Sequence, residues 1–179
     1  MLSFHYPQSD EELAIQTVSN PDAYRILVDR HQEPLLNFIY HNYLRDYDQA
    51  ADIVQEAFIR AYLKSDTFDQ TKKWKTWLYT IAINCVKTFL MKPVAEPLDN
   101  FSIAGDILPD AQLEKTLISH KLFESLSLIN KTHSIILELY YFQNLTYKEI
   151  SAIIKIPVYS VKTRINYAEK MLRRFYIGD

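Results

Sequence analysis

Residues 146–172 carry the spacing of two helices separated by a tight turn, and this pattern constrains the fold more than any other part of the chain. Thr146 and Glu149 form a Thr-x-x-Glu capping box, which predicts a helix start. Pro157 cannot continue that helix but suits the first turn of a second one. The second segment repeats apolar residues at three and four positions and so predicts one buried stripe: Val161, Ile165, Ala168 and Leu172. Polar and basic side chains fill its opposite face, as in a helix-turn-helix that reads the DNA major groove.

The rest of the chain also favours helices. Only 2 glycines occur in 179 residues, which argues against β-hairpins and phosphate-binding glycine loops. Asn20 and Pro21 predict a helix start, and Pro34 predicts the opening of a further helix. Residues 48–64 and 74–90 show the clearest helical periodicity. We therefore expect an all-α protein.

Residues 92–111 interrupt this pattern with three prolines, a glycine and several acidic side chains. Such a composition predicts an extended, negatively charged linker. The chain is accordingly predicted to form two small helical domains, residues 10–91 and 112–179, joined by this Pro-containing acidic linker. The helix-turn-helix lies in the second domain.

The net charge of -2 hides an uneven distribution along the chain. Residues 10–59 hold ten acidic and three basic side chains, whereas residues 60–92 and residues 144–177 each hold seven basic and two acidic ones. Two separate basic blocks suggest two contacts with nucleic acid.

Several function classes find no support in the residues. Cys85 is the lone cysteine, so it excludes an internal disulfide and is expected to be a buried thiol in a reducing compartment. The five histidines are scattered, and neither a nucleophile motif nor a phosphate-binding loop occurs. No long apolar run or signal-peptide pattern is present. We expect a cytoplasmic protein that is not an enzyme, inserts into no membrane, and needs no metal, cofactor or small-molecule substrate.

Three motifs together resemble the extracytoplasmic-function (ECF) group of bacterial sigma-70 factors. Residues 48–62 are similar to the helix by which the family binds core RNA polymerase. Residues 77–84 resemble its Trp-Leu…Ile-Ala…Asn signature. Residues 147–150 and 160–164 match its helix-turn-helix. The likeness extends from about residue 20 to residue 174 and keeps the motifs in the family's order.

The resemblance implies a promoter-specificity subunit of RNA polymerase, with core polymerase, promoter DNA (both duplex and melted strand) and an anti-sigma factor as partners. The expected core-polymerase contacts are Asp52, Gln55, Glu56 and Ile59. The expected contacts with the minus-ten element are Phe68, Lys72, Lys73, Trp74, Lys75, Asn84 and Lys87. The expected contacts with the minus-35 element are Lys148, Lys162, Thr163, Arg164, Asn166, Lys170 and Arg173. Lysine to guanine and asparagine to adenine are suitable base pairings for such a site.

The chain departs from the family pattern in two ways that leave alternatives open. Thr88, Met91 and Lys92 occupy places where the family often has an aspartate and paired arginines, and Lys155 stands where a turn glycine is usual. One alternative is a one-component helix-turn-helix regulator that acts on duplex DNA without core polymerase. Another is a sigma-like protein that binds polymerase but does not open promoters.

Overall fold

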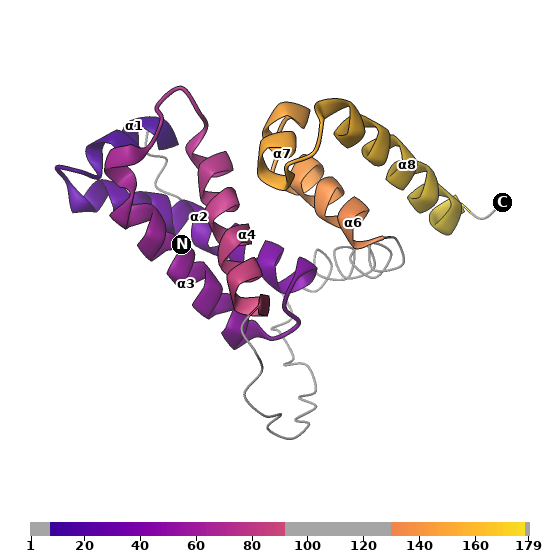
Figure 1. Ribbon diagram of the computed structural model, residues 1–179, viewed down its shortest axis with the longest axis horizontal. Coiled ribbons are helices and arrows are strands. Elements are labelled where there is room, and N and C mark those ends of the chain that lie inside the picture. Colours follow the sequence, from indigo (N-terminus) through magenta and orange to yellow (C-terminus); the bar gives the residue numbers. More distant parts are fainter. Residues whose placement is uncertain (1–7, 92–129, 178–179) are drawn as a thin grey trace, which may run out of the picture.

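The structure is a computed structural model of the chain, and it describes residues 8–91 and 130–177 (Figure 1). All regular elements within these ranges are helical, as expected for an all-α protein. In chain order they are α1 (Asp10–Gln16), α2 (Pro21–Asn42), α3 (Tyr47–Leu63), the short 3-10 turn η1 (Ser65–Thr67), α4 (Trp74–Met91), α6 (Lys131–Leu137), the π-helical turn η3 (Glu138–Phe142), α7 (Tyr147–Ile154) and α8 (Val158–Ile177). The predicted acidic linker, residues 92–111, lies outside the described residues.

Helices α1 to α4 form the first domain around one apolar core. Helix α3 packs against both α2 and α4, and α1 packs against α2 and α4. The helix predicted over residues 48–64 is present as α3, and its apolar stripe is buried: Ala50, Val54, Ala57, Phe58 and Ala61. Cys85 is also buried, as predicted, among the apolar side chains of α4. Removing these apolar surfaces from water supplies the main driving force for folding.

The prediction that Pro34 opens a new helix is wrong. Helix α2 begins at Pro21, capped by the Asn20 side chain as expected, and continues through Pro34 to Asn42. A proline inside a helix removes one backbone hydrogen bond and costs about 3 kcal/mol. Apolar residues on both sides of the proline lie on one fully buried stripe, namely Leu27, Leu35, Phe38 and Ile39. Burying this continuous stripe offsets the local cost, so the chain keeps one long helix.

Helices α6 to α8 form the described part of the second domain. Helix α8 packs against α6 and α7, with η3 joining α6 to α7. The predicted stripe on α8 is largely confirmed, because Val161, Ile165 and Ala168 are buried and Leu172 is partly buried. The helix-turn-helix fold is therefore present where the spacing predicted it.

The two domains are in direct contact. Helix α7 packs against α4, and α6 packs against α2. Figure 1 shows the orange α6 and α7 facing the magenta α4, while the yellow α8 lies on the far side of its own domain. The face of α8 that points away from α6 and α7 is therefore not covered by the first domain.

Candidate nucleic-acid and protein interfaces

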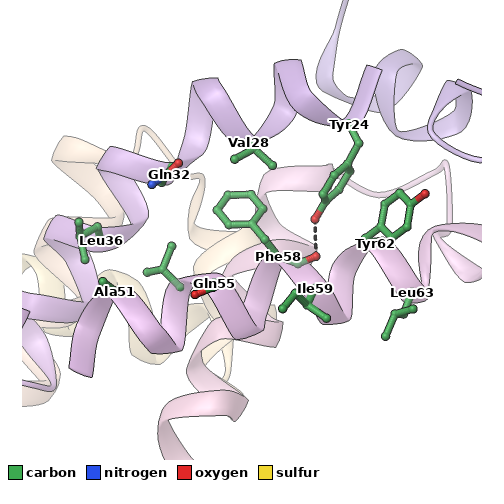
Figure 2. Close-up of a pocket in the computed structure, with 11 residues that line it drawn as sticks. Tyr24, Val28, Gln32, Leu36, Ala51, Gln55, Phe58, Ile59, Tyr62 and Leu63 are labelled. Carbon is green, nitrogen blue, oxygen red and sulfur yellow. Dashed lines mark hydrogen bonds between the residues drawn. The ribbon is translucent and has the colours of Figure 1, made fainter. Parts of the chain in front are cut away.

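An apolar groove runs between α2 and α3 on the surface of the first domain (Figure 2). It has a volume of about 430 Å³, and its walls are almost entirely apolar. Tyr24 crosses the groove and donates a hydrogen bond to the carbonyl oxygen of Phe58, while its ring lies 5.0 Å from the Tyr62 ring. Ile59 and Leu63 on α3 extend the apolar surface outward and are 48% and 71% exposed. Exposed apolar surface next to a groove is typical of a protein–protein contact.

Two acidic side chains lie on α3, the helix that forms one wall of the groove. Asp52 is exposed, and Glu56 lies one turn later on the same helix. The Glu56 carboxylate forms an ion pair with Arg60, with 2.6 Å between Oε1 and Nε. Gln55 lines the groove itself. Of the four side chains expected to contact core polymerase, Gln55 and Ile59 thus line the groove, whereas Asp52 and Glu56 lie on the same helix outside its lining.

The exposed face of α4 and the loop before it form a second candidate surface. Asn84 and Lys87 are exposed on α4, and Lys72 and Lys73 are exposed in the loop. The loop is held by Asp69, whose carboxylate accepts hydrogen bonds from the backbone and hydroxyl of Thr71 and pairs with Lys72 at 3.1 Å. These bonds lower the pKa of Asp69 to about 2. The arrangement presents cationic and amide groups, as contact with a DNA strand requires.

The aromatic residues expected to contact bases near this surface are buried. Trp74 is 2% exposed, and its ring lies 5.1 Å from the ring of His31. Phe68 is 7% exposed and lies against Trp77 at 5.2 Å. Neither ring can stack on a base in this conformation, so the structure gives both a packing role. The lysines that flank Trp74 in the sequence did not keep it at the surface, because α1 covers the start of α4.

Lys75 also differs from the expected phosphate contact. The Lys75 ammonium is half-buried. It donates a hydrogen bond to the carbonyl oxygen of Gln143 in the second domain, with 2.8 Å between Nζ and the oxygen. Burial lowers the pKa of Lys75, and the negative charges of Asp10 and Glu149 partly oppose this effect. In this conformation Lys75 therefore joins the two domains and is only partly exposed to solvent.

Helix α1 supplies positioning residues that the sequence analysis did not identify. The Glu11 carboxylate accepts the backbone N–H of Trp74 at 3.1 Å and so caps the start of α4. The Asp10 carboxylate binds two side chains of α2: its Oδ2 lies 2.6 Å from Nε2 of His31, and its Oδ1 lies 2.7 Å from Nη1 of Arg30. Burial raises the pKa of Asp10, but the bonds and charges of His31 and Arg30 outweigh it and lower the pKa to about 2. No local sequence pattern connects residues so far apart along the chain.

The outer face of α8 forms the third candidate surface. Its exposed side chains include most of those expected to contact the minus-35 element: Lys162, Thr163, Asn166, Lys170 and Arg173. Arg164 is partly buried, and Lys148 is exposed at the start of α7. The Thr163 hydroxyl donates to the Tyr159 carbonyl at 3.0 Å, which leaves its oxygen and methyl group free to meet a base. The surface combines groups suited to base edges with groups suited to phosphates.

The local structure around α8 fixes the orientation of this face. The Thr146–Glu149 capping box is present, with both reciprocal hydrogen bonds. Pro157 directly precedes α8, and its carbonyl accepts the first helical hydrogen bond from Val161. Glu169 on α8 accepts a hydrogen bond from the Tyr141 hydroxyl at 2.5 Å and so ties α8 to η3. This acidic residue on α8 thus has a structural partner.

Lys155 adopts the left-handed conformation in the turn, with φ of 57° and ψ of 46°. Because a Cβ atom is disfavoured there, we expect Lys155→Gly to stabilise the second domain by about 1 kcal/mol. The matched control is Lys148→Gly, which removes the same side chain inside α7 and should destabilise it by about 1 kcal/mol. Hydrogen exchange of the α7 amides in the full chain measures both changes. A loss of protection in Lys155→Gly would contradict the assignment of turn strain.

The described residues give little sign of metal or membrane chemistry. Within residues 8–91 and 130–177, no group of three histidine, cysteine, aspartate or glutamate side chains is placed to hold a metal ion. Across the same part of the chain, no helix has both the length and the apolar character needed to cross a bilayer.

Comparison with known proteins gives one consistent family. Residues 27–93 match the Sigma-70 region 2 family model, and residues 126–174 match the Sigma-70 region 4 model. Among curated proteins, the ECF RNA polymerase sigma factor SigW of Bacillus subtilis (strain 168) is 32% identical over 166 residues, which cover 86% of this chain and 88% of that protein. The ECF RNA polymerase sigma-E factor of Escherichia coli (strain K12) is 29% identical over 180 residues, which cover 92% of this chain and 93% of that protein.

Solved structures show the same fold. CnrH, in complex with the cytosolic domain of CnrY, matches with a TM-score of 0.70 at 21% identity and covers 96% of this chain and 99% of that one. The sigma factor RpoE from Bartonella quintana, in complex with the anti-sigma factor NepR, matches with a TM-score of 0.64 at 19% identity. The match covers 87% of this chain and 98% of that one. At these identities the likeness establishes the fold of the two helical domains.

Proposed function

The chain belongs to the ECF group of RNA polymerase sigma factors, and from this membership we propose how its two domains divide promoter recognition. As a sigma factor it directs core polymerase to specific promoters. Residues 10–91 bind core polymerase and the minus-ten element, and residues 112–179 bind the minus-35 element. The observation that carries this division is the outer face of α8, which exposes Lys162, Thr163 and Asn166 while the opposite face is buried.

The groove between α2 and α3 is the proposed docking site for core polymerase. Its apolar walls can accept side chains of a partner helix, and Ile59 offers an apolar anchor at its edge. The acidic groups Asp52 and Glu56 favour a partner whose surrounding surface is basic. Apolar burial supplies most of the affinity in such a contact, and complementary charge speeds association.

The proposed minus-ten contacts are the exposed groups on α4 and its preceding loop. Lys72, Lys73 and Lys87 bind phosphates, and Asn84 meets a base edge. Lys75 joins this set once its bond to the second domain is broken. Trp74 and Phe68 are buried and support the α4 surface from the core of the first domain. Neither aromatic ring is therefore available to stack on a base of the minus-ten element in this conformation.

On the proposed minus-35 surface, base-reading and phosphate-binding residues respond differently to mutation. We expect Lys162→Ala to cost about 1–3 kcal/mol on one promoter sequence and little on variants at the contacted base. Arg173→Ala should weaken binding to all promoter sequences about equally. It should also reduce the slope of log affinity against log salt concentration by about 1, because one phosphate contact is lost. Titration of both variants against a panel of duplexes at several salt concentrations measures this. An equal loss across all sequences for both variants would contradict the assignment of Lys162.

Run-off transcription tests the whole proposal. Purified bacterial core polymerase is incubated with a pooled promoter library, with and without the chain. Transcripts that appear only with the chain support a sigma factor that opens promoters and identify its promoter sequence. Binding to duplex DNA without binding to core polymerase would instead support a one-component regulator.

A second candidate is a sigma-like protein that binds polymerase without opening promoters. The burial of Trp74 and Phe68 favours it, because capture of an unpaired base usually uses an exposed aromatic ring. Forked promoter DNA with an unpaired minus-ten strand separates the two. A holoenzyme of a full sigma factor should bind the fork more tightly than the duplex, whereas equal affinity for both would favour the second candidate.

We further propose that the chain acts in the cytoplasm, where core polymerase and chromosomal DNA meet, and that it has no catalytic step of its own. An anti-sigma factor is a proposed partner, because two structural neighbours of the same fold are complexes with such inhibitors or with a named cytosolic domain. The exposed apolar side chains Ile59 and Leu63 offer it the same groove that core polymerase uses. Competition between the two partners for this groove would keep the sigma factor inactive.

A further inference from the structure

Tyr159, the second residue of α8, presents an unusually open aromatic ring. It is 80% exposed, more than any other tyrosine among the described residues. Its backbone carbonyl accepts the Thr163 hydroxyl at 3.0 Å. Within the part of the chain that the structure describes, no side chain stacks on the Tyr159 ring or bonds to its hydroxyl. The fold therefore gives this ring no packing role and leaves both its faces available to a partner.

Helical geometry places Tyr159 on the centre line of the proposed minus-35 face. Successive residues of an α-helix are rotated by about 100° around its axis. The side chains proposed for this face all lie within about 60° of Tyr159 around that axis: Lys162, Thr163, Asn166, Lys170 and Arg173. The buried stripe of α8 lies on the opposite side of the helix: Val161, Ile165 and Ala168. The ring thus points in the same direction as the groups proposed to meet DNA.

Tyr159 also lies at the end of α8 that enters the groove first. In a helix-turn-helix, the N-terminal residues of the second helix contact the base edges. With a rise of 1.5 Å per residue, Tyr159 precedes Lys162 by about 4.5 Å along the helix, and neighbouring base pairs are about 3.4 Å apart. We therefore expect Tyr159 to meet a base one or two pairs away from the one that Lys162 contacts, at one end of the element.

The chemistry of the ring selects the base that it can meet. In the major groove, thymine is the base that offers an apolar group, its 5-methyl, whereas the other edges offer hydrogen-bond donors and acceptors. A ring placed against such a polar edge would leave those groups unpaired, which carries a cost. Lys162, Lys170 and Arg173 surround the ring with positive charge, and this charge favours nucleic acid over an apolar protein surface as the occupant.

We propose that Tyr159 is a specificity-determining residue whose ring packs against the 5-methyl group of a thymine at one end of the minus-35 element. The proposal rests on the proposed role of the α8 face in binding this element. It adds an apolar contact to the hydrogen bonds expected from Lys162 and Asn166. It also predicts a preference for thymine over cytosine at one position, because cytosine presents an amino donor and lacks the methyl group.

Exchange of thymine for deoxyuridine tests this contact at a single methyl group. The full chain, with core polymerase present, first recovers its preferred duplexes from a random library. Each thymine of the minus-35 element is then replaced in turn by deoxyuridine, which still pairs with adenine and lacks only the methyl group. At one position the unmodified chain should bind about fourfold more weakly, as expected for one methyl group that leaves an apolar contact.

Two substitutions of Tyr159 separate its ring from its hydroxyl. Tyr159→Phe keeps the ring and should keep the fourfold effect. Tyr159→Ala should bind the thymine duplex about tenfold more weakly and should bind the thymine and deoxyuridine duplexes equally. Because the position is exposed and alanine is a good helix former, both variants should keep the fold, and circular dichroism verifies this.

Two other variants serve as controls. Lys162→Ala should weaken binding yet keep the methyl effect, because it leaves the Tyr159 ring in place. Tyr47→Ala removes a tyrosine of the first domain that is 61% exposed, and it should change neither the affinity for the minus-35 duplex nor the methyl effect. A methyl effect lost in both controls would overturn the assignment to Tyr159.

Several other results would also overturn the contact. A methyl effect that persists in Tyr159→Ala would come from DNA shape or from another residue. A recovered element without a methyl-sensitive thymine, or an equal loss for Tyr159→Ala on all sequences, would exclude base reading by the ring. Unchanged DNA binding in Tyr159→Ala would leave the ring to a protein partner. If the unmodified chain recovers no preferred duplex, the proposed minus-35 role of α8 itself fails, and the inference fails with it.

Discussion

Replacing Trp74 with alanine is expected to destabilise the first domain by about 3–5 kcal/mol. The Trp74 side chain is 2% exposed and lies between the core of α4 and the ring of His31. Its removal leaves a cavity where α1, α2 and α4 meet. The His31 ring, which pairs with Asp10, also loses its contact with the Trp74 ring. A loss of this size is a large share of the stability of a small domain, so its melting temperature should fall by more than about 10 °C.

Asn84→Ala is the matched control, because Asn84 is exposed on the same helix. It should change stability by less than about 0.5 kcal/mol while weakening binding to minus-ten DNA. Thermal and urea unfolding of the full chain, followed by circular dichroism, measure the stability of each variant. A nearly unchanged melting temperature in Trp74→Ala, together with weaker binding to unpaired DNA, would return Trp74 to the base-contacting role that the sequence suggested.

The features that the sequence predicted best are those that depend on neighbouring residues. The capping box at Thr146 and Glu149 forms as expected, and so does the Asn20 cap with Pro21 in the first turn. Each of these signals is complete within four residues, because a cap only needs a side chain that can reach the next turn. The left-handed Lys155 stands where the resemblance to the family implies a turn glycine, so that position was indicated by the resemblance and not by its neighbours.

The features that the sequence did not predict depend on contacts between distant segments. Trp74 stands between lysines and so looked exposed, yet α1 folds over the start of α4 and buries it. Glu11, which caps α4, lies 63 positions away from its partner in the chain. Proline favours the first turn of a helix, so the sequence predicts a helix start at Pro34, but burial of the apolar stripe on both sides of Pro34 keeps α2 continuous. In each case tertiary burial outweighed the local preference.

The contact between the domains has no counterpart in any local pattern. Asn42 and Glu138 are 96 positions apart, and neither residue stands in a motif. A glutamate in the apolar run before the helix-turn-helix could have drawn attention, because a carboxyl group is rarely buried without a partner. The partner itself became visible only once α2 and η3 were placed against each other.

Introducing a positive charge at the edge of the groove, as Ile59→Arg, is expected to weaken binding to core polymerase by at least about 30-fold, or about 2 kcal/mol. Ile59 is 48% exposed and lines the groove beside Phe58 and Leu63. Arginine at this place removes an apolar anchor and opposes the basic surface that Asp52 and Glu56 favour. Because the position is exposed and arginine is a good helix former, the fold of the first domain should be kept.

Ile15→Arg provides the matched control for this prediction. Ile15 is 44% exposed on α1 and does not line the groove, so the same change in charge and size should leave core binding within about twofold. Fluorescence anisotropy with purified core polymerase measures both variants, and binding to a minus-35 duplex verifies that the second domain is intact. Equal losses for the two variants would show a general charge effect. An unchanged affinity for Ile59→Arg would place the polymerase contact elsewhere, and because the groove is then free of polymerase, it would remain a surface for an inhibitor alone.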